Sequence, residues 1–357
     1  SSAAAIARWS GDEYIVAQTR AAADLDSMEQ MAERLIAVFH QPFIVEGEEF
    51  LLTPSIGIAV HPDHGSTPQL LVRNAESAML EAKRRGRATF HVFHGGLGRQ
   101  HDERLAIETQ LRRALDLGEL KLVYQPKLEL STHRLVGVEA LLRWHNRSLG
   151  NVPPDRFIPY AESSGDIVRI GEWVLKQALA DLRLWRLSGL DLECVSVNVS
   201  YRQLINEGFE RVVEEALREN ALEADCLELE FTERVLIDDA PDTMHTLAHL
   251  RRMGVTLTID DFGEGYSALG YLRRLPVQGL KLSHTFMRGV PTQATDTHLC
   301  QAIIALARNL DLSVTIEGVE RHDQLAFVRQ HGAQYGQGYL FAPPLDSATL
   351  LARYLAR

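Results

Sequence analysis

The sequence predicts an α/β protein: a (β/α)8 barrel with one reversed strand, preceded by a partial α+β domain. The barrel is indicated by about eight short apolar runs that alternate with helical stretches over residues 122–341. A second observation concerns how these runs end. Five of them stop at an acidic or amide side chain, and barrels build their active sites where their strands end. These five residues are Glu139, Asn198, Glu230, Asp260 and Glu317.

Composition restricts the class of protein. Of the 357 residues, 45% are hydrophobic and 24% are charged, which suits a folded protein with a sizeable core. The formal net charge of -11 disfavours DNA or an anionic membrane as a partner. Cys194, Cys226 and Cys300 stand far apart, so we expect neither a disulfide framework nor a zinc–thiolate site.

The sequence also bears on location. No apolar run approaches the roughly 18 residues that span a bilayer, and no signal peptide opens the sequence. We therefore expect no direct membrane insertion of these residues. The expected location is cytoplasmic, either alone or as the cytoplasmic part of a larger sensor protein.

Residues 1–94 predict a small α+β domain. A hairpin is expected over residues 8–18, with its turn at Ser10-Gly11-Asp12. Helices follow at 27–39 and 70–84, a β-rich run at 50–60 and a short strand at 89–93. Residues 95–104, which begin Gly95-Gly96-Leu97-Gly98, are typical of a linker, and a helix is expected from about 102 to 117. The barrel domain is then assigned to residues 105–357.

From Leu122 onward strand and helix patterns alternate regularly. Strands are predicted at 122–130, 136–144, 194–200, 227–233, 255–261, 279–282, 312–317 and 335–341. Helices are predicted at 170–185, 209–219, 243–253, 297–309 and 323–331. Only residues 129–134 join the first two strands, which is too few for a helical crossover. These two strands should therefore be antiparallel, which supplies the reversed strand.

The residues at the strand ends form a set of oxygen ligands. Such ligands suit Mg2+ or Mn2+, whereas a zinc site would include His or Cys. A buried ionised carboxylate is costly without a cation, so several together indicate a shared ion. Adjacent Asp260 and Asp261 can share or divide two ions, a usual device in phosphodiester hydrolysis. We expect Lys281 to orient water or neutralise phosphate charge, and Glu317 to act as a base.

Each of these residues also has a purely structural interpretation when it is taken alone. Asp260-Asp261 before Phe262-Gly263 is typical of a turn or a helix cap, and Glu230 or Asn198 could cap a helix. Lys281 alone would be a surface lysine whose stem covers apolar neighbours. Glu139 is harder to explain in this way, because apolar residues flank it. The repetition over successive strands favours the metal site.

Around these positions the sequence resembles the EAL domains, phosphodiesterases that linearise cyclic di-GMP. The resemblance begins with Glu139-Ala140-Leu141-Leu142-Arg143-Trp144 and covers nearly all of residues 105–350. It implies a TIM-like barrel, hydrolysis of cyclic di-GMP to linear pGpG in bacterial second-messenger signalling, and a homodimer formed through this domain. The other motifs that carry it are Tyr124-Gln125-Pro126-Lys127, Phe157-Ile158-Pro159, Val197-Asn198-Val199-Ser200, Asp260-Asp261-Phe262-Gly263, Glu317-Gly318-Val319-Glu320 and Gln337-Gly338-Tyr339.

The resemblance implies roles in catalysis for three matched positions. Lys281 would lie beside the attacking water, and Glu317 and Asp261 would take part in the chemistry. The cofactor would be a pair of Mg2+ or Mn2+ ions. The implied metal ligands are Glu139, Asn198, Glu230, Asp260, Asp261 and Glu317.

Four further matches concern the substrate and a loop. Gln125, Arg143 and Gln337 match positions that touch the dinucleotide in this family. Arg143 suits a phosphate oxygen, because a guanidinium can donate two parallel hydrogen bonds. Glu233 matches the acid that anchors the loop following Asp261.

Residues 1–94 resemble the second half of a GGDEF domain, the diguanylate cyclase fold, in a degenerate form. The hairpin motif is Arg8-Trp9-Ser10-Gly11-Asp12-Glu13-Tyr14, with Ser10 and Tyr14 as departures. Residues 55–59 and 75–83 match later segments of that family. The metal-binding and guanine-reading half of the family's pattern is not in this sequence. We therefore expect no cyclase activity here and consider a regulatory or dimerisation module instead.

Two departures from the EAL pattern leave a second function open. Lys281-Leu282-Ser283 stands where the family usually has Lys-x-Asp, and Glu264 follows Gly263 where a small residue is usual. The first removes a carboxylate, and the second adds a charge to a loop that couples dimer contacts to the metal site in the family. The alternative to a phosphodiesterase is therefore a catalytically weak or inactive receptor that binds cyclic di-GMP and signals to a partner.

Overall fold

The structure is a computed structural model that describes residues 4–18, 25–45, 47–84, 86, 88–233, 241–263, 272 and 274–355. It divides the chain into two compact units, Ser1–Ala106 and Ile107–Arg357. Within the described ranges, no helix combines the length and the apolar character needed to cross a membrane.

The first unit has the predicted α+β character. Its hairpin turns at Gly11, whose φ of +51° suits a residue without a Cβ. Gly57 allows a close approach of helix to strand, because a Cβ there would lie 1.9 Å from the carbonyl oxygen of Ala75. The elements are β1 (Ala4–Ser10), β2 (Glu13–Gln18), α1 (Leu25–Val38), β3 (Phe43–Val45), β4 (Glu48–Phe50), β5 (Ile56–Ile58), α2 (Pro68–Arg84) and β6 (Phe90–Val92).

The segment predicted as a linker is helical in the structure. Residues 95–104 belong to α3 (Gly95–Ala114), which begins about seven residues before the predicted helix start. Glycine weakens a helix by about 1 kcal/mol relative to alanine without preventing one, and the residues that follow are good helix formers. The domain boundaries at 94 and 105 stay predictions.

The second unit contains a closed barrel, as predicted. Among the eight barrel strands, neighbours are parallel except that β7 runs antiparallel to both β8 and β15, which confirms the reversed strand. The pairing of β8 with β10 completes the circle, and β9 (Gly150–Val152) extends the sheet beside β8. In order around the barrel the strands are β7 (Leu120–Glu129), β8 (Leu135–Asn146), β10 (Cys194–Asn198), β11 (Leu227–Thr232), β12 (Thr256–Phe262), β13 (Gly279–Leu282), β14 (Ser313–Ile316) and β15 (Tyr335–Gly336).

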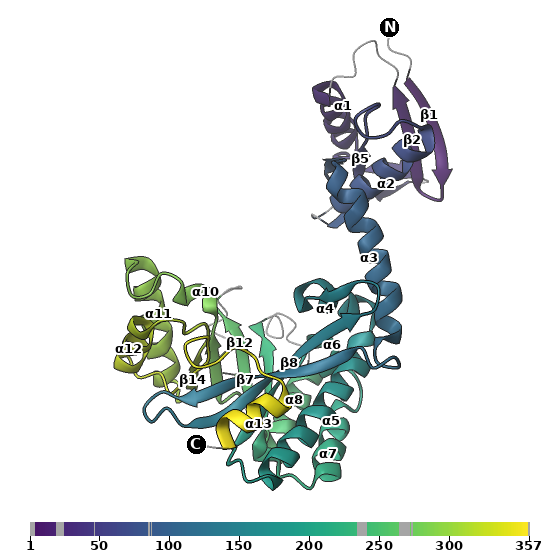
Figure 1. Ribbon diagram of the computed structural model, residues 1–357. Helices are drawn as coiled ribbons and strands as arrows, with labels where there is room; N and C mark the ends of the chain where they lie inside the picture. Colours follow the sequence, from purple (N-terminus) through teal and green to yellow (C-terminus); the bar gives the residue numbers. More distant parts are fainter. Residues whose placement is uncertain are drawn as a thin grey trace. The chain divides into compact units, whose positions relative to one another are not determined.

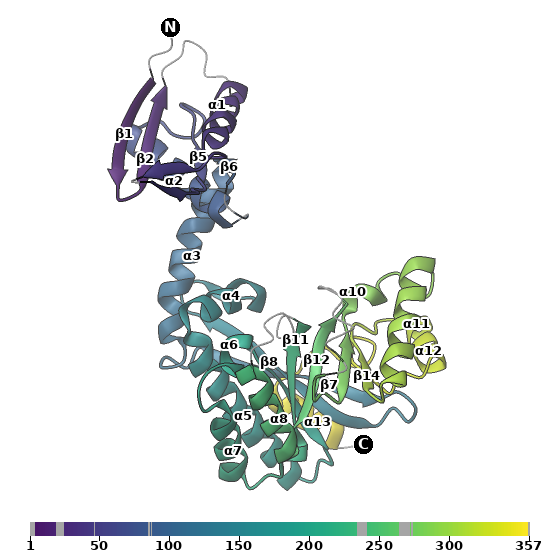
Figure 2. The ribbon, with the colours of Figure 1, turned by 180° about the vertical axis from the view of Figure 1, so that it is seen from behind.

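Helices cover the outside of the barrel. In Figure 1 and in Figure 2, α5 and α7 lie together on one side, and α11 and α12 lie on the opposite side. The five predicted barrel helices are present. The structure adds α4, α6, α10 and α13, which the sequence analysis missed. The helices are α4 (Pro154–Ser164), α5 (Asp166–Leu187), α6 (Tyr201–Leu204), α7 (Phe209–Asn220), α8 (Pro241–Met253), α10 (His284–Met287), α11 (Ala294–Asn309), α12 (His322–Gln330) and α13 (Ser347–Leu355), with a 3-10 turn at Ala224–Cys226.

Side chains alternate between two environments along the barrel strands. On β11, Leu227, Leu229 and Phe231 join the hydrophobic core. The alternate residues Glu228 and Glu230 are buried as well, but they contact other polar side chains. Because successive side chains of a strand point to opposite faces, the apolar set packs toward the helices and the polar set lines the barrel interior. This polar interior carries the candidate site.

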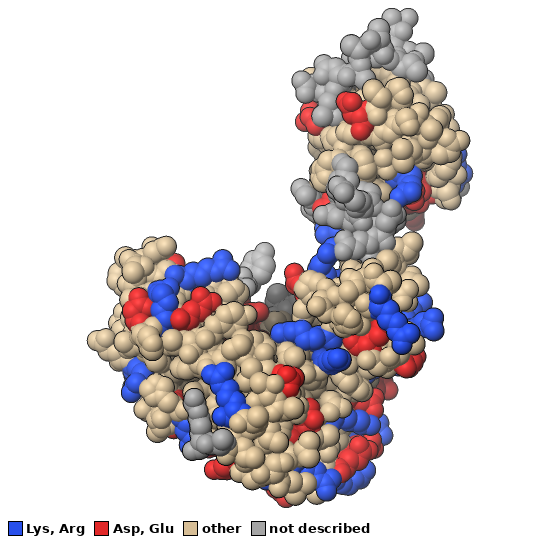
Figure 3. Space-filling model, viewed as in Figure 1, with Lys and Arg blue, Asp and Glu red and all other residues tan. Residues whose placement is uncertain are grey.

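The face of the second unit that Figure 3 shows carries scattered charged side chains. On the face in Figure 3, acidic and basic side chains of the described residues are interspersed over this unit. Such mixing gives no single-sign field over this face that would attract a polyanion.

Candidate active site

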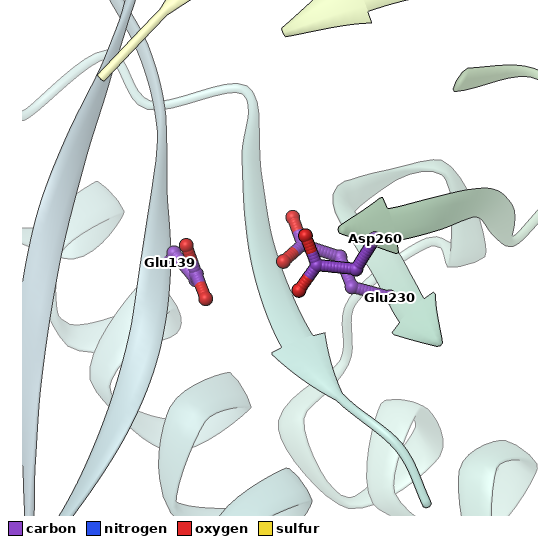
Figure 4. Close-up of side chains that lie close together, drawn as sticks. All are labelled: Glu139, Glu230 and Asp260. Carbon is purple, nitrogen blue, oxygen red and sulfur yellow. The ribbon is translucent and has the colours of Figure 1, made fainter. Parts of the chain in front are cut away.

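Neighbouring barrel strands bring the predicted acids together, although Glu139 lies inside β8 and does not end it, contrary to the prediction. Glu139, Glu230 and Asp260 each offer a carboxylate oxygen within 4.8 Å of the others. In Figure 4 the carboxylates of Glu230 and Asp260 lie next to each other, and Glu139 faces them from β8. Asp260, Asp261 and Glu317 form a second such group, also within 4.8 Å. The two groups share Asp260, so five carboxylates meet at one end of the barrel.

Lys281 lies at the centre of these carboxylates. Its Nζ is 2.6 Å from Glu230 Oε2 and 2.8 Å from Glu317 Oε1. It is also 3.0 Å from Glu139 Oε2 and 3.2 Å from Asp260 Oδ1. The side chain is fully buried, so the interpretation of Lys281 as a surface lysine is wrong. One ammonium group therefore balances only part of the negative charge.

The titration behaviour of the acids reflects this excess of charge. Burial raises the pKa of Glu230 well above its usual range, and the neighbouring charges of Glu139 and Asp260 add to that rise against the effect of Lys281. Burial also raises the pKa of Glu317, to about 7. At Glu139 burial acts in the same direction, but Lys281 and two amide donors outweigh it and lower the pKa.

A backbone irregularity turns two adjacent acids toward the same place. The pairing of β12 with β13 shifts register between Ile259 and Phe262. Asp261 has a φ of +51°, a left-handed conformation that aspartate tolerates better than most residues. Its N–H donates to Asp260 Oδ1 over 2.9 Å. Without this bulge, alternation along the strand would send the two carboxylates to opposite faces.

Two amide side chains hold Glu139 in place. Asn198 Nδ2 donates to Glu139 Oε1 over 2.7 Å. Gln337 Nε2 donates to Glu139 Oε2 over 2.6 Å and to Glu317 Oε1 over 3.2 Å. Gln125, the third predicted amide, instead donates to the carbonyl oxygen of Ala342 over 2.6 Å. Gln337 thus lies among the predicted metal ligands, whereas Gln125 contacts a main-chain group in this structure.

Arg143 and Glu233, two further predicted site residues, form hydrogen bonds with main-chain groups. Arg143 is half-buried, and its Nη1 donates to the carbonyl oxygen of Leu142 over 2.8 Å. Burial lowers the pKa of Arg143, although Tyr339 and Glu139 act in the opposite sense. Glu233 Oε1 accepts a hydrogen bond from the N–H of Gly263, directly after Asp261 and Phe262. Glu233 therefore contacts the start of the loop that it was predicted to anchor.

The two departures from the EAL pattern fall in different places. Ser283 is fully buried and is the N-cap of α10, where its Oγ accepts from the N–H of Thr285 over 3.4 Å. Serine is a good N-cap, as aspartate is, so the position keeps a capping side chain. Glu264 lies outside the described residues.

The donor set fits a hard divalent cation. All charged donors are carboxylates, as Mg2+ and Mn2+ prefer. Oε1 of Glu230 is buried and has no hydrogen-bond partner among the described residues, so this oxygen could serve as a ligand. A bound cation would also offset the charge that Lys281 leaves uncompensated.

The sequence analysis missed a second buried ion pair. Lys127 Nζ contacts Glu228 Oε2 inside the barrel. Lys127 was quoted within a motif, and Glu228 stands two residues before Glu230, but neither received a role. A usable signal existed, because Leu227-Glu228-Leu229-Glu230 and Thr256-Leu257-Thr258-Ile259-Asp260 place polar residues at every second position. A strand that is buried on both faces and still alternates in this way indicates a polar barrel interior.

Two family matches cover most of the chain. Residues 108–344 match the EAL domain family. Residues 1–89 match the family described as diguanylate cyclase, GGDEF domain.

Relatives of known name match along almost the whole chain. Cyclic di-GMP phosphodiesterase NbdA of Pseudomonas aeruginosa is 38% identical over 348 residues, which are 97% of this chain and 44% of that protein. Cyclic di-GMP phosphodiesterase PdeR of Escherichia coli is 35% identical over 355 residues, which are 99% of this chain and 53% of that protein. The chain therefore spans about half the length of these relatives.

Solved structures match the second unit. The PaMucR phosphodiesterase in complex with c-di-GMP is 40% identical with a TM-score of 0.65, and the match covers 69% of this chain and 99% of that one. The EAL enzyme Bd1971, with cAMP and cyclic di-GMP bound, is 34% identical with a TM-score of 0.67 over 71% of this chain and 69% of that one. With the family match and the barrel geometry, these findings place the chain in the EAL domain family, with a GGDEF-domain segment before the barrel.

Proposed function

We propose that this chain is a metal-dependent phosphodiesterase that hydrolyses cyclic di-GMP to linear pGpG. The observation that carries the proposal is the group of five carboxylates around Lys281 at the strand ends of an EAL-family barrel. NbdA and PdeR are named for action on the same dinucleotide, and the PaMucR structure contains it.

The strand-end residues would hold the ions. When bound, Mg2+ or Mn2+ supplies a Lewis acid for the attacking water and for the charge on the phosphate. Asp260 belongs to both carboxylate groups, so it would help to hold an ion in either one. The proposed ligands are Glu139, Asn198, Glu230, Asp260, Asp261 and Glu317.

Glu317 and Lys281 would assist the attack on phosphorus. Of the four acids that Lys281 contacts, Glu317 has the most exposed side chain, at 18%. It is therefore the acid that water reaches most readily, and a carboxylate oxygen there can accept the proton of the attacking water. Lys281, 2.8 Å from Glu317 Oε1, would favour its ionised form.

Other side chains would bind the dinucleotide. Arg143 uses one guanidinium nitrogen for the Leu142 carbonyl, and the remaining N–H groups suit a phosphate oxygen. Gln125 and Gln337 would add polar contacts, and Glu233 would fix the loop after Asp261 through Gly263. From the family resemblance we also propose a homodimer through this domain, which light scattering of the purified protein tests.

Product analysis tests the proposed reaction. The purified chain is incubated with cyclic di-GMP and either Mg2+ or Mn2+, and the products are separated by chromatography. We expect linear pGpG, lost in EDTA and in Glu139→Ala. Glu129→Ala is the matched control, because Glu129 lies at the other end of the barrel and accepts from Thr132. Normal turnover in Glu139→Ala would refute the proposed site.

The same experiment distinguishes a receptor from an enzyme. Saturable binding of cyclic di-GMP without any pGpG would indicate the receptor, and Ser283→Asp would then test whether the missing carboxylate is the cause. Because Ser283 caps α10, we expect the parent chain to be active without that carboxylate.

A further inference from the structure

A second polar layer lies inside the barrel, beyond the carboxylates of the candidate site. It consists of Lys127 on β7, Ser196 on β10, Glu228 on β11 and Thr258 on β12. Each of these residues is at most 5% exposed. Burying a charged pair costs several kcal/mol per ion unless its geometry and hydrogen bonds compensate, so the layer needs an explanation.

The layer is a closed hydrogen-bond network. Lys127 Nζ contacts Glu228 Oε2 and lies 3.4 Å from Ser196 Oγ. Ser196 Oγ donates to the same glutamate oxygen over 2.7 Å, and Thr258 Oγ1 donates to Glu228 Oε1 over 2.6 Å. Both carboxylate oxygens of Glu228 are thus satisfied, unlike those of Glu230. The network connects four strands through one side chain each.

Every member of this network is two residues from a residue of the candidate site. Residues two apart on a strand share a face and are separated by roughly 6–7 Å, so the network lies directly beneath the site. On the reversed strand β7 the order is inverted, which places Lys127 in the lower layer and Gln125 in the upper one. The pairs are Lys127 with Gln125, Ser196 with Asn198, Glu228 with Glu230 and Thr258 with Asp260.

The neighbouring strand leaves space for the lysine. Gly137 on β8 is paired with Lys127, and a Cβ at Gly137 would lie 3.3 Å from Lys127 Cε and 2.7 Å from Cys194 Sγ. A larger residue at 137 would displace the lysine stem. The interior is therefore shaped so that Lys127 reaches Glu228, which stands on a strand that is not adjacent to β7.

We propose that the Lys127–Glu228 pair, with Ser196 and Thr258, positions the metal ligands of the layer above. Its contacts link β7 to β10, β11 and β12, and they fix the positions of these strands along the barrel axis. The same contacts therefore set the spacing of Asn198, Glu230 and Asp260. The inference rests on the proposed metal site. Lys127 and Glu228 are positioning residues, because they act through the strands.

A purely structural pair would behave differently. It would contribute to stability alone, so its loss would lower the melting temperature while the folded protein still bound metal normally. A positioning pair changes the affinity for metal in the folded protein. Residues that support metal ligands change affinity by about 10–100-fold when they are mutated.

The test compares Mn2+ binding in several variants. The dissociation constant for Mn2+ is measured by isothermal titration calorimetry on Lys127→Met, Glu228→Gln and the milder Thr258→Val. Thermal unfolding in EDTA is measured on the same samples. Arg134→Met is the matched control, because Arg134 stands directly before β8 and forms an exposed ion pair with Glu193, away from the buried network.

We expect the dissociation constant to rise about tenfold or more in Lys127→Met and Glu228→Gln, about threefold in Thr258→Val and less than twofold in Arg134→Met. Values within twofold of the parent in folded Lys127→Met and Glu228→Gln would overturn the proposal. If both of these variants fail to fold, an unchanged dissociation constant in Thr258→Val overturns it. Absence of Mn2+ binding in the parent chain would instead overturn the proposed metal site, and this proposal with it.

Discussion

Replacing Glu230 by glutamine should stabilise the metal-free protein. Glu230 Oε2 accepts from Lys281 over 2.6 Å, whereas its Oε1 is buried without a hydrogen-bond partner in the described structure. Glu139 and Asp260 place carboxylate oxygens within 4.8 Å of this residue. A glutamine can keep the bond from Lys281 through its amide oxygen and direct its NH2 group toward these carboxylates.

The magnitude follows from the distances. At an effective dielectric constant of about 20, two like charges 4.8 Å apart repel by about 3.5 kcal/mol, so Glu139 and Asp260 together disfavour ionised Glu230 by about 7 kcal/mol. Attraction to Lys281, whose Nζ lies 2.6 Å from Glu230 Oε2, favours ionised Glu230 by about 6 kcal/mol. The two effects nearly cancel, and the cost of burying the charge remains. We expect Glu230→Gln to be more stable by about 1–2 kcal/mol, or about 2–8 °C for a domain of this size.

Differential scanning calorimetry in EDTA measures this effect. Glu193→Gln, which removes one partner of an exposed ion pair, should change stability by no more than about 0.5 kcal/mol. Added Mn2+ at about 100 times its dissociation constant should stabilise the parent by about 2.7 kcal/mol and Glu230→Gln much less. A lower melting temperature for Glu230→Gln in EDTA would refute the view that the carboxylates repel one another without an ion.

Three further predictions concern neighbouring positions. Burial would raise the pKa of Glu228, but Lys127 outweighs it and the pKa is about 2. Since this pKa lies below the ordinary value of 4.5, the pair stabilises the folded protein above about pH 4.5, and this stabilisation is lost as the pH falls toward 2. The free energy of urea unfolding should therefore decrease more between about pH 6 and pH 3 in the parent than in Glu228→Gln. Equal decreases in the two proteins would contradict the prediction. Gly263→Ala should cost about 1–3 kcal/mol, because φ is +97° and the new Cβ would lie 2.8 Å from Phe286 Cζ. Gly118→Ala, with a φ of +65° and nothing within 4 Å, should cost less in the same melting experiment, and the reverse order would be evidence against the close packing. Asp261→Asn keeps a residue that tolerates positive φ, so it should weaken Mn2+ binding in calorimetry without lowering the melting temperature in EDTA; unchanged binding would remove Asp261 from the ligand set.

Much of the barrel could be predicted from local patterns. The strand runs and the short connection at 129–134 gave the fold and the reversed strand, because period-two alternation and connection length are properties of nearby residues. The last strand was predicted as seven residues and is only Tyr335–Gly336, since Gly338 turns the chain at a φ of +156°. Helix α4 was missed: Pro154 opens the helix, where proline is tolerated, but Pro159 stands inside it, where proline usually breaks a helix.

The site could be predicted in its residue types but not in its contacts. The acids were found because each ends or interrupts an apolar run. The central place of Lys281 could not be inferred, since its partners Glu139 and Glu230 are 142 and 51 residues away in the sequence. The same holds for Lys127 and Glu228, which are 101 residues apart. The shift of register at Asp261 depends on the pairing of β12 with β13, so the local sequence does not predict it.

The most direct test of the account is a titration of hydrolysis with metal. The rate of pGpG formation from cyclic di-GMP is measured by chromatography as free Mn2+ is raised from an EDTA-buffered start. The account predicts no product at the start, a saturable rise in the parent chain and no rise in Glu230→Gln. Full turnover in EDTA, or a normal rise in Glu230→Gln, would contradict it.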